Sequence, residues 1–149
     1  MAAETAKPRR VSDPAKADAR WFTGVLQHTG VLGHAVVTQV GRQRIGTGQM
    51  GQNVAFSLTY DRSAPEAPPS VVGKFPSPEP KSRAAAKTFR TYEREVGFYE
   101  EIAETVDIRV PVCYLADIDL DTGDFVLLLE DLRPALQPGI APWHLLPAR

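Results

Sequence analysis

The chain has 149 residues, of which 43% are hydrophobic and 23% charged, so its composition predicts one packed domain and excludes a disordered chain. Its 17 basic and 18 acidic residues give a formal net charge of −1, which offers no electrostatic basis for binding nucleic acid or an acidic membrane. Cys113 is the single cysteine, so no intrachain disulfide or cysteine metal cluster is expected.

The N-terminal region predicts a flexible start and one short helix. Residues 1–11 are rich in alanine, proline and charge, and are expected to be a disordered lead-in. They contain no apolar secretory segment, and no run in the chain approaches the ~20 apolar residues of a membrane span, so a cytoplasmic location is expected. Ser12 or Asp13 is predicted to cap a helix that ends near Gly30. The apolar face of this helix consists of Trp21, Phe22, Val25 and Leu26.

The next segment predicts three strands. Valines and an isoleucine over 36–45 indicate a first strand, and 46–52 is a glycine-rich turn. Residues 54–60 alternate between apolar and polar, the pattern of a half-buried strand, so the two strands are expected to form an antiparallel hairpin. A proline-rich loop over 61–70 precedes a short β-branched strand over 71–75.

One long helix and two strands complete the predicted fold. The helix is expected to begin near residues 80–83 and to end before Pro111, and strands follow at 112–116 and 125–129. The apolar stripe of the helix advances in steps of three and four: Phe89, Tyr92, Val96, Tyr99, Ala103 and Val106.

These elements predict an α+β fold. Residues 12–133 are expected to form a single domain with an antiparallel sheet of about five strands, a short N-terminal helix and one long helix. Residues 134–149 contain four prolines and are interpreted as an irregular tail.

The glycine-rich turn contains a GxGxxG run formed by Gly46, Gly48 and Gly51. In a dinucleotide-binding fold such a run opens a helix, whereas here it precedes an alternating strand. This context favours a hairpin that covers nucleotide phosphates with backbone N–H groups. The alternative is a plain hairpin turn without a ligand.

Lys74 lies in the middle of the apolar third strand, on the same face as Val72. A buried lysine requires a partner, and Glu95 borders the apolar stripe of the predicted long helix. The two side chains are therefore candidates for an ion pair. The alternatives are an edge-strand lysine that points into water and a glutamate on a solvated helix face.

The chain leaves the last apolar strand through Glu130, Asp131 and Leu132. If the glycine-rich hairpin covers a nucleotide, the main-chain groups at this exit are candidates for hydrogen bonds to the edge of its adenine ring. The alternative is a strand that ends in acidic surface residues.

Four separated segments resemble one family of small-molecule kinases: Val-Val-Gly-Lys-Phe at 71–75, Tyr-Glu-Arg-Glu-Val-Gly-Phe-Tyr at 92–99, Val-Pro-Val-Cys-Tyr at 110–114 and Leu-Leu-Leu-Glu-Asp-Leu at 127–132. The family includes aminoglycoside phosphotransferases, choline kinases and ecdysteroid kinase-like enzymes. The resemblance covers roughly residues 30–133 and implies a protein kinase-like N-terminal lobe.

The resemblance also implies a role for each site residue. ATP and Mg²⁺ are the implied cofactors, and a small molecule with a hydroxyl group is the implied acceptor. Gly46, Gly48 and Gly51 are expected over the phosphates, with Lys74 on the α- and β-phosphates. Glu95 is expected to orient Lys74, and Val72 to pack on the adenine ring. Glu130, Asp131 and Leu132 are expected at its edge.

The sequence departs from the family after Leu132. The family's catalytic lobe carries an H-G-D…N loop and a D-x-D segment for the base and the metal, and neither motif follows. His144 precedes Leu-Leu instead of Gly-Asp, so no catalytic and no metal-binding residue is assigned. The chain alone is expected to be inactive. Two alternatives remain: a non-catalytic kinase-like binding or regulatory module, and a fragment of a dinucleotide-binding oxidoreductase. The sequence does not indicate an oligomeric state.

Overall fold

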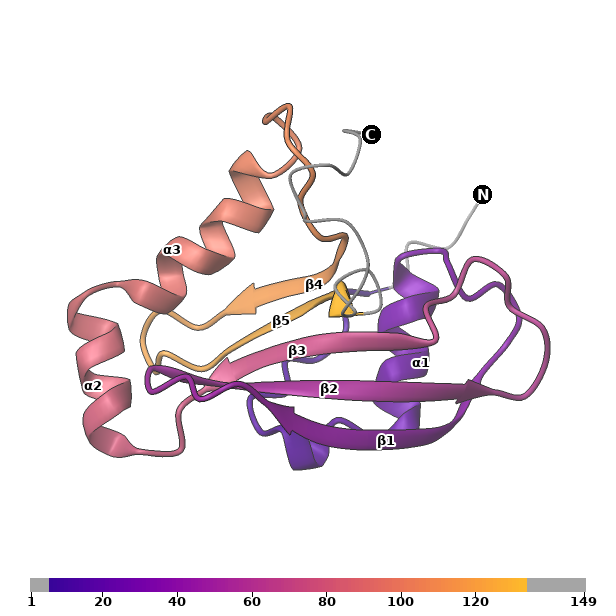
Figure 1. Cartoon of the computed structure of the whole chain (residues 1–149), viewed down its shortest axis with the longest axis horizontal. Coiled ribbons are helices and arrows are strands. Elements are labelled where there is room, and N and C mark those ends of the chain that lie inside the picture. The colour runs from indigo at the N-terminus through magenta and orange to yellow at the C-terminus, as the bar shows by residue number, and fades with distance from the viewer. Residues whose placement is uncertain (1–5, 134–149) are drawn as a thin grey trace.

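The computed structural model describes residues 6–133, and the predicted tail at 134–149, with His144, lies outside them. The described chain forms an α+β domain built on a single sheet (Figure 1). In chain order its elements are η1 (Pro14–Lys16), α1 (Ala19–His28), β1 (Val37–Ile45), β2 (Gly51–Tyr60), β3 (Ser70–Pro76), α2 (Pro80–Thr88), α3 (Thr91–Gly97), η2 (Phe98–Ile102), β4 (Cys113–Ile118) and β5 (Phe125–Glu130).

The sheet confirms the predicted number and direction of strands. Its five strands are ordered β1-β2-β3-β5-β4, and every neighbouring pair is antiparallel. β1 and β2 form the predicted hairpin around the glycine-rich turn. β5 lies between β3 and β4, so the chain crosses from β3 through the helices to the far edge and then returns.

The first helix forms where the apolar face predicts it, but its cap differs from the expected one. Asp13 caps η1, the single turn that precedes the helix, by accepting a hydrogen bond from the N–H of Ala15 at 2.9 Å. α1 itself is capped by Asp18, whose carboxylate accepts from the N–H of Trp21 at 2.8 Å. Gly30 follows the helix with φ of 81°, a conformation that glycine adopts without strain.

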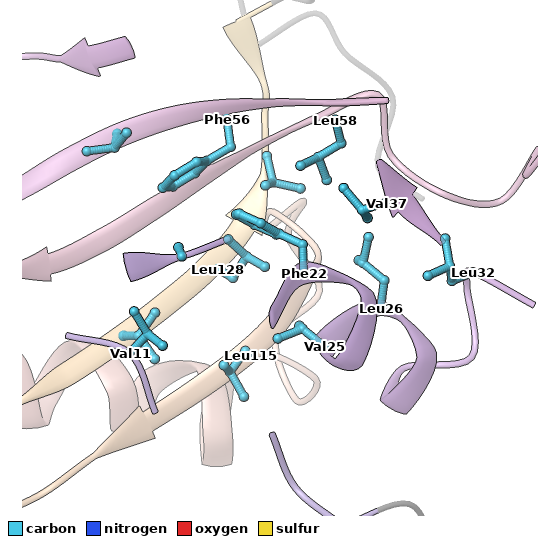
Figure 2. Close-up of a cluster of buried hydrophobic side chains, with 14 of the residues drawn as sticks. Val11, Phe22, Val25, Leu26, Leu32, Val37, Phe56, Leu58, Leu115 and Leu128 are labelled. Carbon is cyan, nitrogen blue, oxygen red and sulfur yellow. The ribbon is translucent and has the colours of Figure 1, made fainter. Parts of the chain in front are cut away.

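Alternation along β5 divides the apolar interior into two clusters. Val126 and Leu128 belong to the cluster beneath α1, and Figure 2 shows Phe22 of α1 close to Leu128. Phe125, Leu127 and Leu129 belong to the cluster beneath α2 and α3. Because successive strand residues point to opposite faces, the helices cover both sides of β5. The sheet is thus the middle layer of three.

The predicted long helix is broken in the structure. α2 ends at Thr88, and Arg90 then adopts a left-handed conformation with φ of 54° before α3 begins. Phe89, expected on the apolar stripe, is 65% exposed at this break. Helical spacing alone does not reveal the break, because Tyr92 and Val96 of α3 are buried as the stripe requires.

The described part of the expected lead-in packs against the domain. Val11 is buried in the cluster beneath α1, and residues 6–11 form no helix or strand. Arg10 forms ion pairs with Asp117 and Asp119 at 3.0 and 3.3 Å, and Lys7 pairs with Asp117 at 3.1 Å. This segment therefore lies along the end of β4, at the edge of the sheet.

Candidate functional site

The structure brings Lys74 and Glu95 together, as the sequence predicts. Lys74 lies on β3, and its ammonium group forms an ion pair and a hydrogen bond with the Glu95 carboxylate of α3. Each side chain is 32% exposed, so the pair is accessible to a ligand from one side. On the same strand as Lys74, Val71 and Phe75 point to the opposite face of the sheet, into the cluster beneath α1.

The glycine turn passes close to β3 beside this ion pair. Gly46 has φ of 71°, in the left-handed region that other residues rarely adopt. A Cβ atom on Gly51 would lie 2.9 Å from the Phe75 carbonyl oxygen, too close for any side chain. A Cβ atom on Gly48 would lie 3.4 Å from the Gly51 carbonyl oxygen. The turn therefore requires glycine at Gly46 for its conformation and at Gly51 for its packing.

A cavity of about 250 Å³ lies between the turn, β3 and α3. Gly48 and Gly51 line one side of it, and Lys74 and Glu95 another. Four of the predicted site residues therefore meet in one place. The remaining five do not line this cavity: Gly46, Val72, Glu130, Asp131 and Leu132.

Val72 instead belongs to an apolar row beside the cavity. The register places it between Ala55 of β2 and Leu129 of β5, with Gln43 of β1 beyond Ala55. The adjacent row contains Lys74, and the two rows face the same side of the sheet. Val72 is partly exposed, whereas Ala55 and Leu129 on either side of it are buried.

Two residues of the site were not anticipated from the sequence. Asn53 pairs with Lys74 across the β2–β3 ladder and lines the cavity. Tyr92 also lines it, and its hydroxyl donates to the Met50 carbonyl of the glycine turn. The GxGxxG motif ends before Asn53, and Tyr92 lies on the apolar stripe, where a tyrosine is expected to be a core residue.

The acidic side chains at the exit from β5 take part in internal contacts. Glu130 accepts hydrogen bonds from Arg109 and from the N–H of Val112, both at 3.1 Å. Asp131 pairs with Arg133 at 2.7 Å, and the hydrogen bonds from that guanidinium lower the pKa of Asp131 to about 2. A ligand role for this segment would therefore belong to its main chain.

The described residues provide no ligand set for Mg²⁺. Among residues 6–133, no group of three or more histidine, cysteine or acidic side chains is placed to hold a metal ion. Glu95 is the carboxylate that lines the cavity, and it is paired with Lys74. Cys113 lies elsewhere, on β4, and burial raises the pKa of its thiol to about 11.

Comparison with protein-family models, with curated proteins and with solved structures finds no match to this chain. In the described part of the chain, no helix is both long and apolar enough to cross a membrane. The geometry of the site therefore carries the functional argument.

Proposed function

We propose that the chain is a protein kinase-like N-terminal lobe that binds ATP and belongs to a phosphotransferase acting on a small molecule. The observation that carries this proposal is the Lys74–Glu95 pair beside a glycine turn that cannot accommodate a side chain at Gly51. A lysine held by a carboxylate beside a glycine turn is an arrangement suited to nucleotide phosphates.

In this proposal each part of the site has one task. The N–H groups of the turn and the Lys74 ammonium bind the phosphate oxygens, and Glu95 holds the lysine side chain in place. Val72, which is partly exposed, packs against the adenine ring, and the main chain at 130–132 bonds its edge. ATP supplies the phosphoryl group for transfer to a hydroxyl of the acceptor. The described residues contribute binding and orientation.

Thermal unfolding with and without Mg-ATP tests this proposal. At a nucleotide concentration one hundred times Kd, binding adds about 2.7 kcal/mol to the free energy of unfolding, which raises Tm by several degrees. Lys74→Ala is expected to abolish most of this rise, because it removes the charge that meets the phosphates. Lys81→Ala is the matched control, since Lys81 is exposed on α2 and does not line the cavity.

The measurements distinguish a chain that does not bind nucleotide from one that binds it without transferring a phosphoryl group. A wild-type Tm that does not respond to Mg-ATP, or an equal response in Lys74→Ala, would contradict the proposed nucleotide site. ATP binding without phosphoryl transfer to hydroxyl compounds supports the proposed nucleotide site. It also characterises a non-catalytic binding module, and joining the lobe to a catalytic lobe of the family would then distinguish the two by restored transfer.

A further inference from the structure

We infer that Tyr92 is the residue that positions the glycine turn, so that α3 sets both the turn and the Lys74–Glu95 pair. This inference rests on the proposed nucleotide site and adds a positioning residue to it. Tyr92 touches no residue that is expected to react. It acts through the turn, whose backbone groups are the expected phosphate ligands.

The hydroxyl of Tyr92 makes two hydrogen bonds with a defined direction. It accepts from the main-chain N–H of Ser77 at 3.0 Å, and that N–H is buried. The partner on its other side is the Met50 carbonyl oxygen, which can only accept. The hydroxyl proton must therefore point at Met50, and a single hydroxyl group joins the turn to the segment that follows β3.

The ring of Tyr92 is fixed independently of these hydrogen bonds. Its side chain is buried, with the residue only 5% exposed, and its ring packs against Phe125 with centroids 4.3 Å apart. A large buried aromatic ring has few alternative rotamers in a packed interior. The position of the hydroxyl, and with it the position of the turn, therefore follows the position of α3.

One helix thus makes both of the contacts that shape the site. Tyr92 and Glu95 are three residues apart on α3, a spacing that places them on the same side of the helix. Glu95 reaches Lys74 on β3, and Tyr92 reaches Met50 in the turn. A displacement of α3 would change the lysine and the turn together.

The contact also fixes the orientation of one peptide group. With its carbonyl held by Tyr92, the peptide between Met50 and Gly51 cannot rotate freely, and the N–H of Gly51 points away from the tyrosine because the peptide is planar and trans. A phosphate binds N–H groups and is repelled by carbonyl oxygens. Loss of the contact is therefore expected to weaken phosphate binding and to leave adenine binding unchanged.

Tyr92→Phe tests this inference, because it removes the hydroxyl and keeps the ring against Phe125. We expect the Kd for ATP to rise about fivefold, the effect of losing one hydrogen bond. The Kd for adenosine, which has no phosphates, should stay the same. A purely structural role would lower Tm without changing the ratio of the two Kd values. An unchanged ratio in a folded Tyr92→Phe protein would overturn the inference.

Amide hydrogen exchange provides a test that does not depend on nucleotide. In Tyr92→Phe the amides of residues 46–51 should exchange about fivefold faster, while those of β4 and β5 stay unchanged. Tyr99→Phe is the matched control, because it removes a hydroxyl from the adjoining segment η2, away from the turn. Equal exchange in all three proteins would overturn the role of Tyr92. Failure of the wild-type chain to bind ATP would count against the proposed function alone.

Discussion

Gly51, the first residue of β2, follows the glycine turn and lies beside β3 with no space for a side chain. A Cβ atom at this position would lie 2.9 Å from the Phe75 carbonyl oxygen, which belongs to the main chain of a strand paired with β2. The glycine is therefore required by packing as well as by any contact with phosphate. Sequence spacing identifies the glycine but does not distinguish these two reasons.

Gly51→Ala is expected to lower the free energy of unfolding by about 1–3 kcal/mol, because the new methyl group overlaps a main-chain oxygen. Gly24→Ala is the matched control. Gly24 is exposed on α1 with open space around it, so alanine should raise stability by about 0.5–1 kcal/mol. Urea unfolding of both variants measures the difference. A Gly51→Ala protein as stable as the wild type would show that the turn does not lie this close to β3.

Residue roles were predictable from sequence where a residue conflicts with its surroundings. Lys74 in an apolar strand requires a partner, which makes Glu95 a candidate from the sequence, and the structure shows this ion pair. Tyr92 shows no such conflict, because its ring satisfies the apolar stripe and its hydroxyl has no signature in hydrophobic periodicity. The three-dimensional proximity of Met50 and Ser77 was needed to assign it.

At the scale of elements, the break between α2 and α3 is the main departure from the predicted fold. The N–H of Phe89 bonds the Ala85 carbonyl and that of Arg90 bonds the Lys87 carbonyl, which ends α2. Glycine or asparagine usually occupies the left-handed position after a helix, and here it is Arg90. The sequence therefore lacked the residue that marks such an end.

Arg90→Gly tests the strain at this break. Arg90→Ala is the reference, because both variants lose the ion pair that Arg90 forms with Glu93 at 2.5 Å. The free energy of unfolding of the glycine variant should be about 0.5–1 kcal/mol higher than that of the alanine variant. The relief of the left-handed conformation outweighs the added freedom of the unfolded chain. Chemical denaturation of the two variants gives this difference directly. Greater stability of the alanine variant would indicate that α2 and α3 are continuous in solution.

At the scale of the whole molecule, β5 couples the two apolar clusters. Its five residues from Phe125 to Leu129 are all buried, and they alternate between the cluster beneath α1 and the cluster beneath α2 and α3. Neither cluster can lose its packing without exposing one side of the same strand. We therefore expect the described domain to unfold as one cooperative unit.

Phe22→Ala tests this coupling from the α1 side. Phe22 is fully buried and packs on Phe56 at a ring distance of 4.9 Å, so its truncation should cost about 3–5 kcal/mol. The loss should appear equally in the exchange of protected amides in α1 and in α3. Phe89→Ala is the control, since this exposed side chain should change stability by less than about 0.5 kcal/mol.

If Phe22→Ala does not fold, Phe22→Leu leaves a smaller cavity and allows the same comparison of amide exchange in α1 and α3. A loss confined to the amides of α1 would contradict the coupling through β5.

The overall architecture was predictable because it follows from local patterns that the sequence displays. Alternation identified β2, turn residues separated the strands, and the apolar run at 125–129 identified the last strand. The pairing of β3 with β5 and the packing of residues 6–11 were not predictable. They depend on contacts between distant segments, such as Arg10 with Asp117, for which charge pattern gives no partner.

The burial of β5 on both faces has a consequence for how insertions and deletions act on this chain. A strand with one solvent-exposed face tolerates a polar substitution on that face. β5 has no exposed face between Phe125 and Leu129. Inserting one residue before Phe125 would exchange every side chain of the strand between the two helical layers, placing the larger phenylalanine where Val126 now packs. The short connection from β4 to β5, which contains Gly123, therefore sets a length that the whole interior depends on.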